Sequence, residues 1–180
     1  MTDDPAEPPA PEEIRRAANH AAAKRIDRVN RWLHLGGALP ANEYQRFREA
    51  GISHVVDLRE EEDPEAQRLQ TLGIVRRRVP VPNGGPPTVE QLVEVAKWID
   101  ETNNGATLYV HCQGGFGRAA TMAVGLLVVY GAPLDEAIEK VRVARPEMKL
   151  NDKQLAWLRT VEQEFKKTNL KGLRGCNHRD

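Results

Sequence analysis

Residues 107–130, TLYVHCQGGFGRAATMAVGLLVVY, constrain the fold of this chain more than any other segment. The run 107–111 is rich in apolar and aromatic side chains, which is typical of a buried strand. Three glycines follow between positions 113 and 117, and the apolar run 118–130 has the length of a buried helix. The segment therefore predicts a strand, a glycine-rich turn and a helix in direct succession.

The rest of the chain repeats this alternation of β-rich runs and helical patterns. It predicts an α/β fold with a central, mostly parallel sheet of four to five strands flanked by helices. The expected strands are 32–35, 54–58, 75–81 and 107–111. The expected helices are 42–50, 64–72, 88–102, 118–130, 134–144 and 151–165. Thr88 and Gln91 have the spacing of a capping box at the start of one of these helices.

The chain divides into four segments. Residues 1–13 are mostly proline, alanine and acidic residues, which predicts a disordered tail. The Ala- and Arg-rich run 14–30 predicts an N-terminal helix. Residues 31–167 form the predicted catalytic domain, and the polar residues 168–180 form a second tail. A length of 180 residues fits one domain of this kind.

Composition argues against several classes of protein. The 26 basic and 26 acidic residues cancel, so no overall field favours nucleic acid or a membrane surface. No run approaches the about 20 apolar residues of a membrane helix, and no signal peptide pattern is present, so we expect a cytoplasmic protein without membrane insertion. The two cysteines, Cys112 and Cys176, lie far apart and predict free thiols.

The turn between the predicted strand and helix has the features of an anion site. Successive backbone N–H groups converge at such a turn, and the start of the helix adds unpaired donors and partial positive charge. Gly114, Gly115 and Gly117 allow positive backbone torsions and close approach to a ligand. Arg118 can donate two parallel N–H bonds to a phosphate. We therefore expect an anion, and phosphate in particular, to bind here.

Cys112 lies at the start of this turn, where the helix N-terminus and Arg118 favour the ionised thiol. An ionised thiol is a nucleophile, and the turn would hold phosphate oxygens for in-line attack. The alternative is that Cys112 is a buried structural residue beside an ordinary glycine turn. That alternative would account for a cysteine alone, but it accounts less well for a cysteine together with His111, three glycines and Arg118. No second cysteine or histidine lies at zinc-ligand spacing, and we expect neither a metal nor a cofactor.

The sequence His111-Cys112, five residues and Arg118 resembles the signature of the cysteine-dependent protein tyrosine and dual-specificity phosphatases, of the compact atypical type. The similarity extends over about residues 30–166 through WLHLGGALP, GISHVVDLREEED, VPVPNGGPPT and VRVARPEMKLNDKQLAWL. The resemblance implies a protein tyrosine phosphatase-like fold. It also implies two-step hydrolysis of phosphomonoesters, in which Cys112 attacks phosphorus and water then releases phosphate from a phosphocysteine.

The resemblance also implies roles for the other residues of the turn. Arg118 would bind the equatorial oxygens of the transferred group. His111 would tune the thiolate through hydrogen bonds in the loop, or else be a strand-end histidine satisfied by backbone. The remaining substrate-binding residues would be Gln113, Gly114, Gly115, Phe116 and Gly117. The implied substrate is a phosphorylated protein or a small phosphorylated molecule, and we expect a monomer that binds no nucleic acid.

Two positions depart from the family pattern. Asn83 stands where the family's general-acid loop has aspartate, and Ala119 stands where the family has a hydroxyl. An amide cannot donate the proton, and general acid catalysis contributes about 10²–10⁴-fold. Three explanations stay open: another carboxylate, Asp57 or one of residues 60–63, acts as the acid; the substrate has a good leaving group, such as an aryl phosphate or an anhydride; or the protein is a pseudophosphatase or phosphate-binding module.

Two further hypotheses come from the remaining residues. Arg76 and Arg78 would share one face of a strand, with Arg77 on the other, and could form a basic rim for an acidic substrate or simply be solvated charges. A thiol redox enzyme of the arsenate reductase kind would need a resolving cysteine. Only Cys176 is available, and it lies in the predicted tail.

Overall fold

The computed structural model describes residues 10–61, 64–102 and 105–167. One five-stranded sheet crosses the molecule in the order β1-β2-β5-β3-β4. Its strands are β1 (Ile26–Arg28), β2 (Leu33–Gly37), β3 (His54–Asp57), β4 (Val75–Arg78) and β5 (Leu108–Cys112). β2, β5, β3 and β4 are parallel to one another, and the edge strand β1 is antiparallel to β2. The predicted mostly parallel sheet is therefore confirmed.

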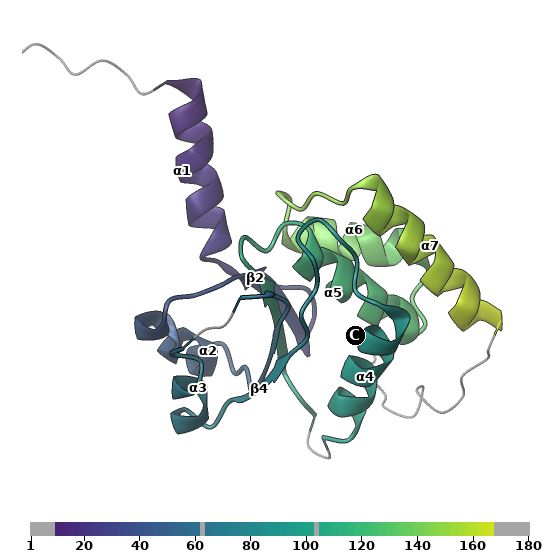
Figure 1. Ribbon diagram of the computed structural model, residues 1–180, viewed down its shortest axis with the longest axis horizontal. Coiled ribbons are helices and arrows are strands. Elements are labelled where there is room, and N and C mark those ends of the chain that lie inside the picture. The colour runs from purple at the N-terminus through teal and green to yellow at the C-terminus, as the bar shows by residue number, and fades with distance from the viewer. Residues whose placement is uncertain (1–9, 62–63, 103–104, 168–180) are drawn as a thin grey trace, which may run out of the picture.

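Helices cover both faces of the sheet (Figure 1). The short helices α2 (Gln45–Glu49) and α3 (Arg68–Thr71) lie on one side, after the 3-10 turn η1 (Ala41–Glu43). The other side holds α4 (Val89–Asp100), α5 (Arg118–Val129), α6 (Leu134–Ala144) and α7 (Asp152–Lys167). The predicted capping box begins α4, since the Thr88 hydroxyl accepts from Gln91 N and the Gln91 side chain accepts from Thr88 N.

The centre of the molecule is the strand–turn–helix segment from which the prediction began. Every residue of β5 and every residue of α5 is buried. β5 is the middle strand of the sheet, and α5 packs against α4, α6, α7 and the sheet. A helix that is apolar on all sides is buried on all sides. The central position of the strand–turn–helix segment therefore follows from its sequence.

The N-terminal region differs from the prediction. Helix α1 spans Pro11–Ala23 instead of residues 14–30, and residues 26–28 form the edge strand β1. The helix therefore begins inside the predicted tail and ends seven residues early. β1 exists because it pairs with β2, a tertiary interaction that the local alanine and arginine content does not reveal. Residues 1–9 and 168–180, which include Cys176, lie outside the described residues.

Helix α1 projects away from the rest of the fold (Figure 1). Among its residues whose burial is described, Ala22 alone is buried. In the described part of the chain, no helix has both the length and the apolar character to cross a membrane.

Candidate active site

The loop that joins β5 to α5 lies at the carboxyl edge of the parallel sheet. Residues 112–118, here called the cysteine loop, begin at the last residue of β5 and end at the first residue of α5. Parallel pairing places Gly37 opposite Cys112 and Asp57 opposite His111. Ligands of open α/β sheets bind at this edge because strand ends and helix N-termini converge there.

The glycines of the cysteine loop serve different purposes. Gly115 has a φ of 77°, and a Cβ built on it would lie 2.3 Å from the carbonyl carbon of Gly36. Gly114 and Gly117 do not have positive φ, so the prediction of left-handed torsions holds for Gly115 only. Their constraint is space: a Cβ would lie 2.9 Å from the Phe116 ring at Gly114, and 3.3 Å from the Gln154 amide at Gly117.

Cys112 lies at the floor of the loop and is 4% exposed. Its Sγ accepts a hydrogen bond from the backbone N–H of Gly115 at 3.3 Å. This backbone donor is directed at the atom that would act as the nucleophile. Gly115 thus has both features: its backbone lies in the left-handed region, and its N–H donates to the Cys112 sulfur.

Arg118 begins α5 and is 7% exposed. Its Nη1 donates to the carbonyl oxygens of Leu58, at 3.3 Å, and Val81, at 3.0 Å. These bonds fix the guanidinium to two neighbouring strand ends. In the described residues no hydrogen bond engages Nε or Nη2, so this edge of the fork can bind an oxyanion.

A cavity of about 400 Å³ opens over the cysteine loop. It brings together most of the residues predicted from the sequence, namely Cys112, Gln113, Gly114, Phe116, Gly117, Arg118 and Asn83. His111 and Gly115 do not line the cavity. The wall is completed by five residues for which no role in a site was predicted: Gly84, Lys149, Leu150, Asn151 and Gln154.

Asn151 and Gln154 attach the Asn83 loop to the start of α7. Each accepts at its side chain the backbone N–H of the other, at 3.0 and 3.1 Å, which is a reciprocal helix cap. Their amide nitrogens donate to the carbonyls of Gly84, at 2.8 Å, and Gly85, at 3.2 Å. The Asn-x-x-Gln spacing could have predicted the cap, but not the contact across the cavity.

His111 is buried beneath the loop, and burial lowers its pKa to about 4. The neighbouring Asp57 carboxylate opposes this effect without overcoming it. The ring is therefore neutral at neutral pH and adds no positive charge to the site. Its Nδ1 lies 3.4 Å from the carbonyl oxygen of Cys112, which is a hydrogen-bond contact with the backbone of the cysteine loop.

Asp57 does not fit the role of substitute general acid. Its side chain is fully buried and receives hydrogen bonds from Arg59, at 2.9 and 3.0 Å, and from Arg76, at 2.7 Å. Burial alone would raise its pKa, but the hydrogen bonds from Arg59 and Arg76 hold the pKa far below the usual range. A carboxylate that stays ionised has no proton to donate. Glu62 and Asp63 lie outside the described residues.

The proposed basic rim is also absent from the site. Arg76 is committed to Asp57, and Arg77 packs over the Trp98 ring at 5.1 Å. Arg78 donates to the backbone carbonyl of Glu60. None of the three lines the cavity over the cysteine loop. They stabilise the sheet edge instead of facing a substrate.

Arg145 holds the outer side of the cysteine loop and is 0% exposed. Its Nη2 donates to the carbonyls of Gly114, at 2.8 Å, and Ala22, at 3.0 Å, and its Nη1 donates to Asp27 at 2.7 Å. The guanidinium also lies 5.0 Å from the centre of the Phe116 ring. One buried side chain thus joins the loop to α1 and β1.

We expect Arg145→Met to destabilise the fold strongly. The change leaves the carbonyl of Gly114 and the Asp27 carboxylate without this partner, and breaking a buried ion pair costs roughly 3–5 kcal/mol. The matched control is Arg142→Met, which removes an exposed pair with Glu139 and should cost less than about 1 kcal/mol. Urea unfolding of the three proteins gives the comparison. Equal losses in the two variants would contradict the assigned role.

No group of three or more potential metal ligands occurs within the ranges that the structure describes.

Comparison with known proteins agrees with this geometry. A family model described as "Swiss Army Knife protein, DSP-PTPase phosphatase domain" matches residues 36–170. Human dual specificity protein phosphatase 12 is 27% identical over 140 residues, which cover 76% of this chain and 41% of that protein. Bovine dual specificity protein phosphatase 26 is 33% identical over 135 residues, which cover 70% of this chain and 60% of that protein. The chain thus spans only part of the length of these relatives.

Solved structures with the same fold include Tk-PTP in its active form and PTPMT1. The Tk-PTP structure has a TM-score of 0.71 and 27% identity, and the match covers 78% of this chain and 97% of Tk-PTP. PTPMT1 has a TM-score of 0.73 and 23% identity, with 81% and 98% covered. The family match begins within β2, at residue 36, and includes β3, β4, β5 and the cysteine loop, while α1 and β1 precede it. The chain therefore belongs to the family of dual-specificity-type (DSP-PTPase) phosphatase domains.

Proposed function

We propose that this protein hydrolyses phosphomonoesters through a phosphocysteine intermediate. The observation that carries the proposal is the Sγ of Cys112 at the floor of a cavity, with the Gly115 N–H at 3.3 Å and Arg118 at the far end of the same loop. Sulfur would attack phosphorus as the bond from phosphorus to the leaving oxygen breaks. Water would then attack the phosphocysteine, releasing inorganic phosphate and the thiolate.

The cysteine loop would bind the equatorial oxygens of the transferred phosphoryl group. Phosphoryl transfer has a loose transition state whose charge lies on those oxygens, so positioning and electrostatic stabilisation supply most of the catalysis. The Nε and Nη2 edge of Arg118 would provide two parallel donors, while its Nη1 stays fixed to Leu58 and Val81. Lys149 in the cavity wall would add positive charge for a dianionic substrate.

The site has few groups that could assist the departure of the leaving group. Asn83 lines the cavity at the general-acid position, and Asp57 stays ionised. Ala119 is buried and has no hydroxyl, and the Thr121 hydroxyl donates to the Gly117 carbonyl at 2.9 Å. We therefore propose phosphate esters with good leaving groups as substrates, such as the phosphotyrosine side chain, whose phenol has a pKa of about 10.

Restoring a carboxylate tests this assignment. We expect Asn83→Asp to raise kcat on alkyl phosphates by at least about 10-fold, because a protonated carboxyl can donate to a poor leaving oxygen. Rates on aryl phosphates should change less, since a phenolate departs without a proton. Steady-state release of phosphate from both classes gives the comparison.

Asn42→Asp is the matched control, because it makes the same chemical change at an exposed residue of η1. It should leave both rates unchanged. An equal rise on alkyl and aryl esters, or no rise on either, would contradict the placement of the acid at residue 83. Tight phosphate binding without any turnover in the unmodified protein would instead favour a phosphate-binding module.

A further inference from the structure

The peptide group between Gly114 and Gly115 is held from both sides. On its outer side, Nη2 of Arg145 donates to the carbonyl oxygen of Gly114 at 2.8 Å. On its inner side, the N–H of Gly115 donates to Sγ of Cys112 at 3.3 Å. The carbonyl and the N–H of a trans peptide group point in opposite directions. The bond from Arg145 therefore fixes the direction of the N–H that faces the sulfur.

This peptide group has little conformational restraint of its own, because a glycine lies on each side of it. Glycine adopts positive and negative φ about equally well, so the two residues themselves offer little resistance to a rotation of the group. Such a rotation would take Gly115 away from its φ of 77° and turn its N–H away from the sulfur. The carbonyl oxygen of Gly114 would then face the sulfur side of the loop, where it would repel a bound anion.

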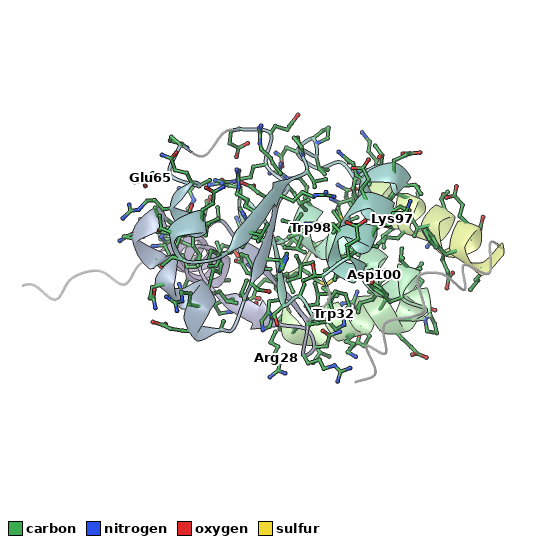
Figure 2. All side chains as sticks on the ribbon, turned by 90° about the horizontal axis from the view of Figure 1, so that it is seen from below. Arg28, Trp32, Glu65, Lys97, Trp98 and Asp100 are labelled. Carbon is green, nitrogen blue, oxygen red and sulfur yellow. The ribbon has the colours of Figure 1, made fainter. Side chains whose placement is uncertain are left out.

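Arg145 is itself fixed by the first strand. Its Nη1 donates to Oδ2 of Asp27 on β1 at 2.7 Å, and the Asp27 side chain is only 11% exposed. Neighbouring residues of a strand point to opposite faces of the sheet. Figure 2 shows the next residue, Arg28, at the edge of the molecule with its guanidinium directed outward, whereas the Asp27 carboxylate is directed at the buried Arg145.

The Asp27 carboxylate also accepts hydrogen bonds from Arg25. Nε and Nη2 of Arg25 donate to the two oxygens of Asp27, both at 3.1 Å. The same guanidinium donates to Glu147 at 2.8 and 2.7 Å, and these bonds lower the pKa of Glu147 to about 2, so that it stays ionised. Two arginines and two carboxylates thus form one network that joins β1 to the segment between α6 and α7.

We propose that Asp27 is a positioning residue for the cysteine loop, because it acts through Arg145 on the peptide group whose N–H faces Cys112. Asp27 holds the guanidinium of Arg145, and the guanidinium holds the carbonyl of Gly114 with its N–H side toward the sulfur. β1 precedes the matched family domain, so a strand outside that domain supports its active site. The expected effect on turnover rests on the proposed hydrolysis, but the expected effect on anion binding does not.

Binding of inorganic phosphate tests the proposal without any turnover. Calorimetric titration of the full chain gives the affinity, and urea unfolding first identifies conditions in which each variant is folded. We expect Asp27→Ala to weaken phosphate binding about 10-fold, because the released peptide group can turn its carbonyl oxygen toward the anion. Loss of the negative charge alone would strengthen phosphate binding. The sign of the change therefore separates positioning from charge.

Two further variants complete the test. Asp27→Asn keeps the volume of the side chain and an oxygen that can accept from Arg145, so its phosphate affinity should lie between those of Asp27→Ala and the unmodified protein. It takes the place of Asp27→Ala if that variant does not fold. Asp135→Ala removes an exposed aspartate of α6 and should leave the affinity unchanged. Unchanged or tighter phosphate binding in a folded Asp27 variant would overturn the proposal.

Turnover of p-nitrophenyl phosphate shows whether the same restraint serves catalysis. We expect Asp27→Ala to lower kcat at least about 10-fold, since one preorganised donor to an oxyanion contributes more than this. Normal turnover in folded Asp27→Ala would overturn the positioning role and leave the proposed hydrolysis intact. Absence of turnover in the unmodified protein would overturn the proposed hydrolysis instead, and the phosphate titration would still decide the role of Asp27.

Discussion

Replacing Cys112 with serine should abolish hydrolysis of p-nitrophenyl phosphate, with a loss on the order of 10³-fold or more in kcat, as expected when a covalent nucleophile is removed. His111 would not ionise a serine hydroxyl at this position, because a pKa of about 4 makes the ring a weak base and its Nδ1 contacts the Cys112 carbonyl. The N–H of Gly115 that meets Sγ at 3.3 Å stabilises an anion, which the hydroxyl does not become. Steady-state release of p-nitrophenolate measures the effect.

The binding function of the loop should survive the same change. The donors that would bind oxyanions are backbone N–H groups and Arg118, so phosphate should still bind to Cys112→Ser with an affinity similar to that of the unmodified protein. Cys176→Ser is the matched control and should keep full activity. Loss of turnover in Cys176→Ser would indicate the thiol redox alternative, and substantial turnover in Cys112→Ser would rule out the phosphocysteine route.

The second large effect is expected from Arg118→Lys, which should lower kcat by about 10²–10³-fold, the usual cost of one preorganised oxyanion donor. Lysine retains the charge but cannot donate two parallel N–H bonds while also bonding to two backbone carbonyls. Arg118 could do both, since Nη1 is held by Leu58 and Val81 and the Nε and Nη2 edge is left for the proposed phosphate. Phosphatase kinetics on an aryl phosphate measure the loss.

Two measurements separate this role from a structural one. Urea unfolding of Arg118→Lys reports the cost of the anchoring bonds, and Arg159→Lys, an exposed residue on α7, provides the control substitution. The expected pattern is a fall in kcat at substrate saturation with most of the protein folded. A rise in KM with unchanged kcat would mean that the guanidinium binds substrate and transition state equally, and would contradict the proposed role.

The local structure around the cysteine loop could be predicted because it depends on consecutive residues. Cys112, the three glycines and Arg118 lie within seven positions, and the apolar segments on both sides require a buried strand and a buried helix. The turn between these two elements therefore has little choice of geometry. The structure refined one detail, since Gly115 alone of the three has positive φ.

Contacts between distant segments could not be predicted in the same way. Asp57 was a candidate acid until the fold placed Arg59 and Arg76 on its carboxylate, and the same contact removed Arg76 from the proposed rim. Arg145 had no assigned role until the fold brought Ala22, Asp27 and Gly114 to its two Nη groups. In each case the partners are separated by two to more than a hundred positions, and charge alone does not specify the pairing.

The sequence by itself determined the central strand, the cysteine loop and the helix behind it, because local periodicity and glycine positions restrict a continuous segment to one conformation. Only the tertiary structure decided which polar groups pair with each other and which line the cavity over the cysteine loop. Burial and pairing depend on parallel strand register, and register is set by the packing of the whole sheet and not by any one of its strands.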